Sequence, residues 1–457
     1  MHDDYLFLPV EIKARELHGK MLLALCAAEA GFAVVIGRQK VLREQLHNFP
    51  AGLYLDKSVA VSKERWFKRF RNLGNRVVAW DEEGLVIHEE QYLKSRISER
   101  ALALTDLFFA WGAAQRDILA NAFVDREQMF VLAGNPRFDL LRVELRGLYS
   151  DAAERLRDRY GHIILINTNF GFYNHFKGAA EAKRIFSQSS SHADERFIDN
   201  WIDYQEKLFH AFAAVLPWLG ERFSQHTIIV RPHPSENEER WQVEAGRVAN
   251  VRVVKEGSVI EWIMASDVMV HSNCTTGIEA YLLGVPPIAY RPVTSEIYET
   301  FLPNALSKSV YSFDSFKACM SELLSSDEAA PDWLANDEKQ KICSAYISGT
   351  SGQLASDCIV ENLTALVDSS GQWKADQSLS RRFQVLLNQL RTTKDFLLRW
   401  KSVYRRAERY DRLKFPHLQL RELEEIGQRF TDLTGRFDDI AVSEFTKECF
   451  MLRRISR

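Results

Sequence analysis

The sequence predicts an α/β protein with two successive domains that face a cleft, followed by a helical extension. Apolar runs of strand length alternate with helical patterns from Tyr5 to about residue 140. The alternation restarts at Ile163, after a charged run at 144–159, and it stops after Thr350. Because alternating strands and helices build parallel sheets, we expect Rossmann-like domains at 1–150 and 151–368 and an extension at 369–457.

The first domain opens with a predicted β-α-β unit. Tyr5–Val10 is an apolar strand, 11–31 has apolar residues at helical spacing, and Phe32–Ile36 is a second strand. A right-handed crossover of this kind makes the two strands parallel. Further strands are expected at Arg76–Trp80, Leu107–Ala110 and Met129–Ala133.

Carboxylates follow two of these strands. Asp81, Glu82 and Glu83 come directly after Arg76–Trp80 and are followed by a glycine, while Glu11 follows the first strand. Crowded carboxylates raise at least one pKa, so one of them could act as a general base or nucleophile. In an extended chain Asp81 and Glu83 would point one way and Glu82 the other, and we assign the catalytic role to Glu82. The alternative is a solvated acidic turn.

Basic residues lie close to these carboxylates in the sequence. Four of them could bind an acidic sugar or acceptor, or could be ordinary surface charge: Lys13, Arg15, Arg38 and Lys40. The run 63–76 mixes basic and aromatic residues, which suits either an anionic lipid surface or the buried face of an amphipathic helix.

The second domain carries the predicted nucleotide site. Its first strand, Ile163–Asn167, leads into a glycine- and aromatic-containing loop at 168–177 that includes Asn169. A polar segment at 187–195 is expected to be a mobile surface loop, and a long helix follows at 197–218.

Two later strands end in loops suited to a phosphate. Thr227–Val230 ends in Arg231, Pro232, His233 and Pro234, and Val268–Val270 ends in a hydroxyl-rich turn before the helix 278–283. Backbone N–H groups at a helix start favour phosphate, although Ser and Thr there are more often plain helix caps. The predicted nucleotide-binding residues of that turn and helix are Ser272, Asn273, Thr275, Thr276, Gly277 and Glu279, the last near a ribose.

The C-terminal part, 378–457, is predicted to be helical throughout, with breaks at Pro416 and near Gly435. Its stretch 381–415 is strongly basic and includes aromatic residues, which suits a membrane surface or a partner subunit. A polar linker at 369–377 precedes it, so we expect this part to be dispensable for the chemistry.

Composition narrows the function. A net charge of −3 gives no global attraction to nucleic acid, and six scattered cysteines without paired spacing argue against a zinc site or a disulfide framework. The start of the chain lacks a signal-peptide pattern, and no run of apolar residues could span a membrane. These features favour a cytoplasmic protein without a zinc site. The resemblance described next implies in addition that the protein is peripheral at the inner membrane and uses no metal and no cofactor.

Over roughly residues 1–365 the chain resembles bacterial surface-carbohydrate biosynthesis proteins of the GT-B glycosyltransferase type. Three short motifs resemble those of CMP-sialic acid and CMP-Kdo transferases: Glu82-Glu83-Gly84, His233-Pro234, and the Ser272, Thr275, Thr276 group. The resemblance implies that the His-Pro motif contacts the CMP phosphate. It also implies that Glu82 deprotonates the acceptor in an inverting enzyme, or that a carboxylate attacks the sugar in a retaining one.

The function expected from this resemblance is transfer of an acidic sugar, Kdo from CMP-Kdo, to a glycan or lipid-linked acceptor in lipopolysaccharide or capsule biosynthesis. Alternatives are a polyol-phosphate transferase that uses CDP-glycerol and a nucleotide-sugar epimerase. A non-enzymatic alternative is an adaptor that joins a polysaccharide assembly complex through 378–457.

Overall fold

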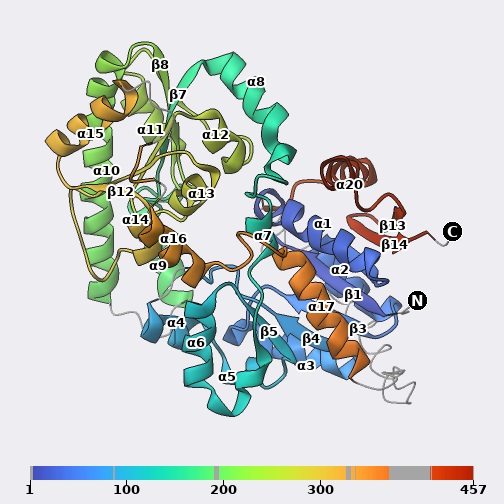
Figure 1. The fold of residues 1–457 in the computed structure, drawn as a ribbon. Coiled ribbons are helices and arrows are strands. Elements are labelled where there is room, and N and C mark those ends of the chain that lie inside the picture. The colour runs from blue at the N-terminus through green and yellow to red at the C-terminus, as the bar shows by residue number, and fades with distance from the viewer. Residues whose placement is uncertain are drawn as a thin grey trace, which may run out of the picture. The chain divides into compact units, whose positions relative to one another are not determined.

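The computed structural model describes residues 4–85, 88–189, 195–325, 331–334, 336–369, 412 and 414–455. The chain forms two compact units. The first comprises Met1–Leu148 together with Ser344–Arg457, and the second is Tyr149–Cys343. Both are α/β units with parallel strands (Figure 1), as the sequence predicts. That the units face a cleft stays a prediction.

The first unit has an eight-stranded sheet in the order β13-β14-β2-β1-β3-β4-β5-β6. Its strands are β1 (Tyr5–Val10), β2 (Ala33–Arg38), β3 (Gly52–Asp56), β4 (Arg76–Ala79), β5 (Leu107–Ala110), β6 (Phe130–Leu132), β13 (Ile440–Thr446) and β14 (Cys449–Arg454). Six of these strands are parallel to one another, namely β2, β1, β3, β4, β5 and β6 in sheet order. Strand β3 was not predicted, because its short sequence GLYLD offers few apolar residues before Asp56.

Helices cover this sheet. They are α1 (Lys13–Glu29), α2 (Gln39–Gln45), α3 (Glu64–Asn72), α4 (Glu89–Arg96), α5 (Glu99–Leu102), α6 (Ala113–Ala122), α7 (Pro136–Asp139), α17 (Ala355–Asp368) and α20 (Leu420–Thr434). Helix α3 buries Phe67 and Phe70 in the core, which supports the amphipathic-helix interpretation of the run 63–76. Helix α1 is almost entirely buried because α7, α17 and α20 all pack against it.

The second unit has a six-stranded parallel sheet in the order β12-β11-β10-β7-β8-β9. Its strands are β7 (His162–Asn167), β8 (His226–Arg231), β9 (Val251–Val253), β10 (Val268–His271), β11 (Pro287–Tyr290) and β12 (Lys308–Val310). Its helices are α8 (Ser150–Tyr160), α9 (Ala179–Ser189), α10 (Glu195–Arg222), α11 (Glu238–Ala245), α12 (Val259–Ala265), α13 (Thr276–Leu283), α14 (Phe301–Leu306) and α15 (Phe313–Ser325), and α16 (Asp337–Tyr346) runs through the boundary between the units. Residues of α10, α11 and α15 form one apolar core with the strands.

The C-terminal part differs from the prediction. Helix α20 is present, but β13 and β14 form an antiparallel hairpin where a helix was expected. Strand β14 pairs with the edge of β2, and Phe450 and Leu452 are fully buried. Figure 1 shows the hairpin, in red, beside α20 and α1. Residues 414–455 therefore belong to the first unit. They are not the separate helical unit on which the expectation of dispensability rested, and that expectation stays a prediction.

The predicted domain boundaries also differ from the two units. The boundary near 150 lies close to Leu148, whereas 344–368, predicted in the second domain, is part of the first unit. The reason is that α17 packs on α1 and α7, far from it in sequence. The predicted linker at 369–377 lies outside the described residues except for 369, and the basic run 381–415 lies outside them except for 412, 414 and 415. Most of the predicted mobile loop at 187–195 also lies outside them. In the parts that the structure describes, no helix has the length and apolar character needed to cross a membrane.

Candidate active site

A pocket of about 380 Å³ lies at the carboxyl ends of β1, β3 and β4 in the first unit. Ligands of open parallel sheets bind at this edge. The pocket brings together three of the four predicted carboxylates, Glu11, Glu82 and Glu83. The rest of its lining is Arg15, Arg43, Lys57, Ser58, Ala60, Ser62, Lys63, Trp66 and Arg96. Carboxylates and cations thus share one concave surface.

Glu82 is the most deeply buried carboxylate of this lining, with 6% of its surface exposed. Its Oε1 accepts a hydrogen bond of 2.9 Å from Trp80 Nε1 and lies 3.9 Å from Lys20 Nζ. Burial raises the pKa of Glu82, and the nearby Glu16 raises it further, against the opposing effect of Lys20. A carboxyl group with a raised pKa is suited to accept or return a proton near neutral pH.

Glu16 and Lys20 form a buried ion pair that sequence reasoning missed. Lys20 Nζ lies 2.8 Å from Glu16 Oε2, and both side chains, one turn apart on α1, are almost fully buried. Glu16 also accepts hydrogen bonds from the backbone N–H groups of Glu11 and Ile12, which fixes the loop between β1 and α1. The available signal was an acidic and a basic residue four apart in a helix whose later turns are apolar.

Glu11 sits among cations. Its Oε2 lies 2.6 Å from Lys57 Nζ, and its Oε1 accepts a hydrogen bond of 3.0 Å from Lys414 Nζ. Burial opposes ionisation of Glu11, but Lys57 and Lys414 outweigh it and lower the pKa to about 2. Glu11 is therefore ionised at neutral pH, whereas the pKa of Glu82 is shifted in the opposite direction. Two carboxyl groups with opposite shifts are a common arrangement for acid–base chemistry.

Asp81 and Glu83 differ from the expected alternation. Asp81 is absent from the pocket lining, since it is fully buried and paired with Arg96. Glu83 Oε1 lies 3.0 Å from Arg15 on the pocket wall. The chain turns at 82–85, and Gly84 N donates to the Asp81 carbonyl, so the alternation of an extended strand does not continue into these residues. Asp81 thus holds α4 through Arg96.

The four predicted acceptor-binding cations have different positions. Arg15 lines the pocket. Lys13 instead donates to the His417 carbonyl and pairs with Glu422, and Arg38 pairs with Glu448, so both hold the C-terminal segment. Lys40 lies on α2 and is outside the pocket lining. The pocket cations that the sequence did not reveal are Arg43, Lys57, Lys63 and Arg96.

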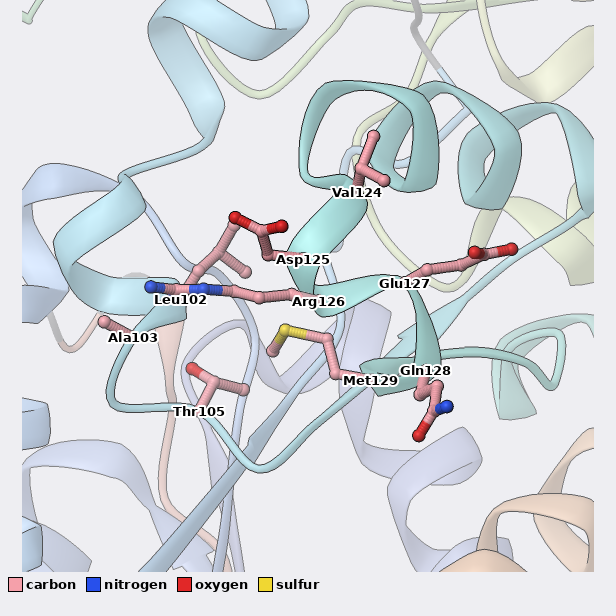
Figure 2. Close-up of a pocket in the computed structure, with 9 residues that line it drawn as sticks. All are labelled: Leu102, Ala103, Thr105, Val124, Asp125, Arg126, Glu127, Gln128 and Met129. Carbon is pink, nitrogen blue, oxygen red and sulfur yellow. The ribbon is translucent and has the colours of Figure 1, made fainter.

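A second pocket, of about 650 Å³, lies elsewhere on the first unit (Figure 2). Its lining comes from the end of α5 and from the turn Val124–Met129, which precede β5 and β6. It therefore lies at the amino ends of these strands. Figure 2 shows the Arg126 side chain extending toward Leu102 and Ala103. None of the predicted catalytic residues lines this pocket, so the smaller pocket is the better candidate for chemistry.

In the second unit, His233 lies in a fixed turn after β8. Ser235 N donates to His233 Nδ1 at 3.2 Å, and Ser235 Oγ lies 2.7 Å from the same atom. Because Nδ1 accepts a backbone hydrogen bond, the proton of the neutral ring is on Nε2, which can donate to an anion. His233 and Pro234 are both exposed.

Glu236 organises the loops around His233, although the sequence did not single it out. It is fully buried. Its Oε1 accepts hydrogen bonds from Thr168 Oγ1, from Phe170 N and from His233 N, at 2.7 to 3.1 Å. Its Oε2 accepts one from Trp241 Nε1 at 2.9 Å. Glu236 thereby ties the loop after β7, which includes Asn169, to the loop after β8.

The buried side chain of His271 fixes the loop after β10. His271 is buried, and its Nδ1 accepts from Cys274 N while its Nε2 lies 2.8 Å from Ser307 Oγ. Burial lowers the pKa of His271 to about 3, helped by Arg291, so the ring is neutral. Gly277 lies directly against this ring, because an added Cβ would be 2.5 Å from His271 Nε2.

The predicted nucleotide-binding residues of this loop and of α13 differ in position and in contacts. Asn273 has φ of +55°, accepts from Thr300 and donates to the Tyr298 carbonyl, so it shapes the loop. Thr276 Oγ1 contacts Cys274 Sγ, 3.1 Å away. Thr275, Gly277 and Glu279 lie at the start of α13, whereas Ser272 directly follows β10. Ser272 and Glu279 are almost fully buried.

Two buried polar side chains mark the carboxyl ends of β7 and β10. Both amide atoms of Asn167 and the hydroxyl of Ser272 have no hydrogen-bond partner within the described part of the chain. Asn167 pairs in register with His271, so these groups are on adjacent strands. Arg231, by contrast, donates to the carbonyls of Glu256 and Gly257 and has a structural role. Unsatisfied buried polar groups are costly, which favours a ligand at this edge.

No protein-family model and no curated protein matches this sequence. Solved structures with a similar fold include UDP-GlcNAc 2-epimerase from Neisseria meningitidis bound to UDP-GlcNAc, with 15% identity, a TM-score of 0.49 and coverage of 80% of this chain and 100% of that one. The wall teichoic acid polymerase TagF is another, with 9% identity, a TM-score of 0.49 and coverage of 80% and 89%.

A third is HepE from Anabaena in complex with UDP-glucose, with 12% identity, a TM-score of 0.41 and coverage of 80% and 100%. All three TM-scores are below 0.5 and the identities are at most 15%.

Proposed function

We propose that this protein is a glycosyltransferase of surface-polysaccharide biosynthesis that transfers an acidic sugar, Kdo from CMP-Kdo, to a glycan or lipid-linked acceptor. The observation that carries the proposal is the pocket at the carboxyl edge of the first sheet. It combines a buried carboxyl group of raised pKa, Glu82, with an ionised one, Glu11, and surrounds them with cations.

The cations account for an acidic substrate. Arg15, Arg43, Lys57 and Lys63 line the pocket and can bind a carboxylate of the sugar or acceptor. Asp56 is fully buried and pairs with Arg43 and Lys63. It thereby holds the guanidinium group of Arg43 and the ammonium group of Lys63 in position. The pocket is therefore preorganised for a negative charge.

In this proposal Glu82 is the general base that takes the proton from the acceptor hydroxyl. Its raised pKa allows it to accept a proton from an acceptor hydroxyl as that oxygen attacks the sugar. Glu11 is the alternative, because an ionised carboxylate can attack the anomeric carbon and form a covalent intermediate. The two roles correspond to inverting and retaining transfer.

In this proposal the second unit binds the nucleotide of the donor. His233 can donate from Nε2 to a phosphate oxygen, and the N-terminus of α13 offers backbone N–H groups to the same charge. Asn167 and Ser272 add buried polar atoms that lack partners in the described residues. The choice of cytidine over other bases rests on the sequence resemblance.

An adaptor is disfavoured by the pocket, because a protein without catalytic activity has no need for a buried and a partly buried carboxyl group with opposite pKa shifts. A CDP-glycerol transferase and a nucleotide-sugar epimerase remain alternatives with the same carboxylate chemistry. Calorimetry with CMP, CDP, UDP and GDP separates them. We expect CMP to bind, and His233→Ala to weaken it about 10- to 100-fold, the value of a hydrogen bond to a charged group. Preference for UDP would overturn the assignment of the donor.

The reaction is tested with CMP-Kdo and a soluble acceptor analogue, followed by mass spectrometry of the product. Glu82→Gln should lower turnover by about 10²–10⁴ with nearly unchanged CMP affinity. Glu83→Gln is the matched control, because Glu83 is on the same wall but 45% exposed and paired with Arg15. Full activity of Glu82→Gln would refute its role. Loss of activity in Glu11→Gln with a sugar attached to the wild-type protein would instead identify Glu11 as a nucleophile.

A further inference from the structure

Two histidines and an aspartate meet at the amino ends of three adjacent strands in the second unit. His162 begins β7, His226 begins β8, and Asp267 directly precedes β10. His162 and His226 are partners in the parallel register, and β7 lies between β8 and β10. We propose that these three side chains bind a zinc ion that links the three strands.

The distances fit a single ion. His162 Nδ1 lies 3.1 Å and His226 Nε2 lies 3.7 Å from Asp267 Oδ2. All three possible ligand atoms lie within 4.8 Å of one another. In a tetrahedral site with zinc–ligand bonds of about 2.0–2.1 Å, ligand atoms are about 3.3 Å apart. The cluster therefore needs only small side-chain movements to close around zinc.

The ligand chemistry selects the metal. Two imidazoles and one carboxylate suit zinc, with water in the fourth position, whereas magnesium and calcium prefer oxygen ligands alone.

Asp267 is held in place by the backbone. Its Oδ2 accepts a hydrogen bond of 3.1 Å from Ile163 N, and its own N–H donates to the Ile163 carbonyl. The carboxylate is thus fixed between β7 and β10 before any metal arrives. Among the residues that the structure describes, this is the one group of three or more potential ligands close enough to share a metal ion.

The position of the cluster implies a structural role. It lies at the amino ends of β7 and β8, whereas the nucleotide loops follow their carboxyl ends. The inference is therefore independent of the proposed transferase activity. Zinc would join the starts of three strands and oppose their separation, so it should stabilise the second unit without taking part in the reaction.

The test uses the full-length chain without an affinity tag, freed of metal with EDTA. Calorimetric titration with ZnCl₂ should show one site, and His162→Ala and Asp267→Asn should each weaken it at least about tenfold. His210→Ala is the matched control, because His210 is an exposed histidine on a helix of the same unit. At a zinc concentration of about a hundred times Kd, the melting temperature of the second unit should rise by about 5–10 °C.

Substitution with Co²⁺ gives a second readout, since tetrahedral histidine-bound cobalt has visible absorption that Asp267→Asn should change. Asparagine can still accept the Ile163 hydrogen bond, so this variant should fold. The proposal is overturned if the wild-type protein binds no zinc. It is equally overturned if both variants bind zinc as the wild type does, which would place the ion elsewhere.

Discussion

Replacing Phe450 with alanine should destabilise the first unit. Phe450 is on β14, is fully buried, and is the register partner of Ile36 in β2. A buried phenylalanine replaced by alanine costs about 3–5 kcal/mol, because the lost burial is joined by a cavity. For a unit of this size each kcal/mol lowers the melting temperature by about 2–4 °C, so we expect a decrease of about 6–20 °C.

The measurement is thermal denaturation combined with hydrogen exchange followed by mass spectrometry. Exchange should increase in the peptide that contains β2, because its edge pairs with β14. Peptides from the second unit serve as an internal reference and should not change. Ile455→Ala is the control variant, since Ile455 is 55% exposed just beyond β14.

An unchanged melting temperature and unchanged exchange in β2 would show that the hairpin is not part of the folded unit. The same result would restore the expectation that the C-terminal part can be removed. Equal effects of Phe450→Ala and Ile455→Ala would show that the strand is sensitive to any change and would contradict the role of burial.

Three further predictions concern the second unit. Gly277→Ala should destabilise it by about 1–3 kcal/mol in urea, because the new Cβ would lie 2.5 Å from His271 Nε2. His271 has a folded-state pKa of about 3, below its ordinary 6.5, so between these values the unfolded state binds the extra proton. The contribution of His271 to the free energy of unfolding should therefore be fully present above about pH 6.5 and fall by up to about 1.4 kcal/mol per pH unit toward pH 3. His271→Gln should reduce this slope. Glu236→Gln should lower the free energy of unfolding by about 1–3 kcal/mol, measured by denaturation. The amide NH₂ of the glutamine would place a donor against Trp241 Nε1 or against the three donors at Oε1.

Strand periodicity was sufficient to predict most of the two sheets. Strands β1, β4 and β8 are apolar runs bounded by charged residues or prolines, and β7 is an apolar run between His162 and Asn167. The same reasoning placed Glu11 and Glu82 at one edge, since parallel strands bring their carboxyl ends together. That both line one pocket follows from this rule.

The pairing of charges could not be predicted. Glu16 and Lys20 lie inside a helix, and only the packing around α1 shows that they are buried beside Glu82. Lys414 reaches Glu11 from about 400 residues away, and local sequence contains no information about such a contact. The opposite pKa shifts of Glu11 and Glu82 depend on these partners.

The C-terminal hairpin was missed because its turn lacks the usual residues. Two-residue hairpin loops favour Asn or Gly, which accept positive φ, whereas this turn has Lys447 and Glu448, with φ of +64° at Glu448. Glu448 is almost fully buried and pairs with Arg38, which helps to hold that conformation. The stabilisation comes from tertiary contacts and leaves no local signal.

The pairing of β14 with β2 also determines when the first unit can be completed during synthesis. Strand β2 leaves the ribosome early, but its edge partner follows about 400 residues later. At about 5–20 residues per second, the edge of β2 stays open for about 20–80 s. The second unit is continuous in sequence and can fold within that time. An open edge strand is a template for pairing with other chains, so newly made protein is most exposed to aggregation in this interval.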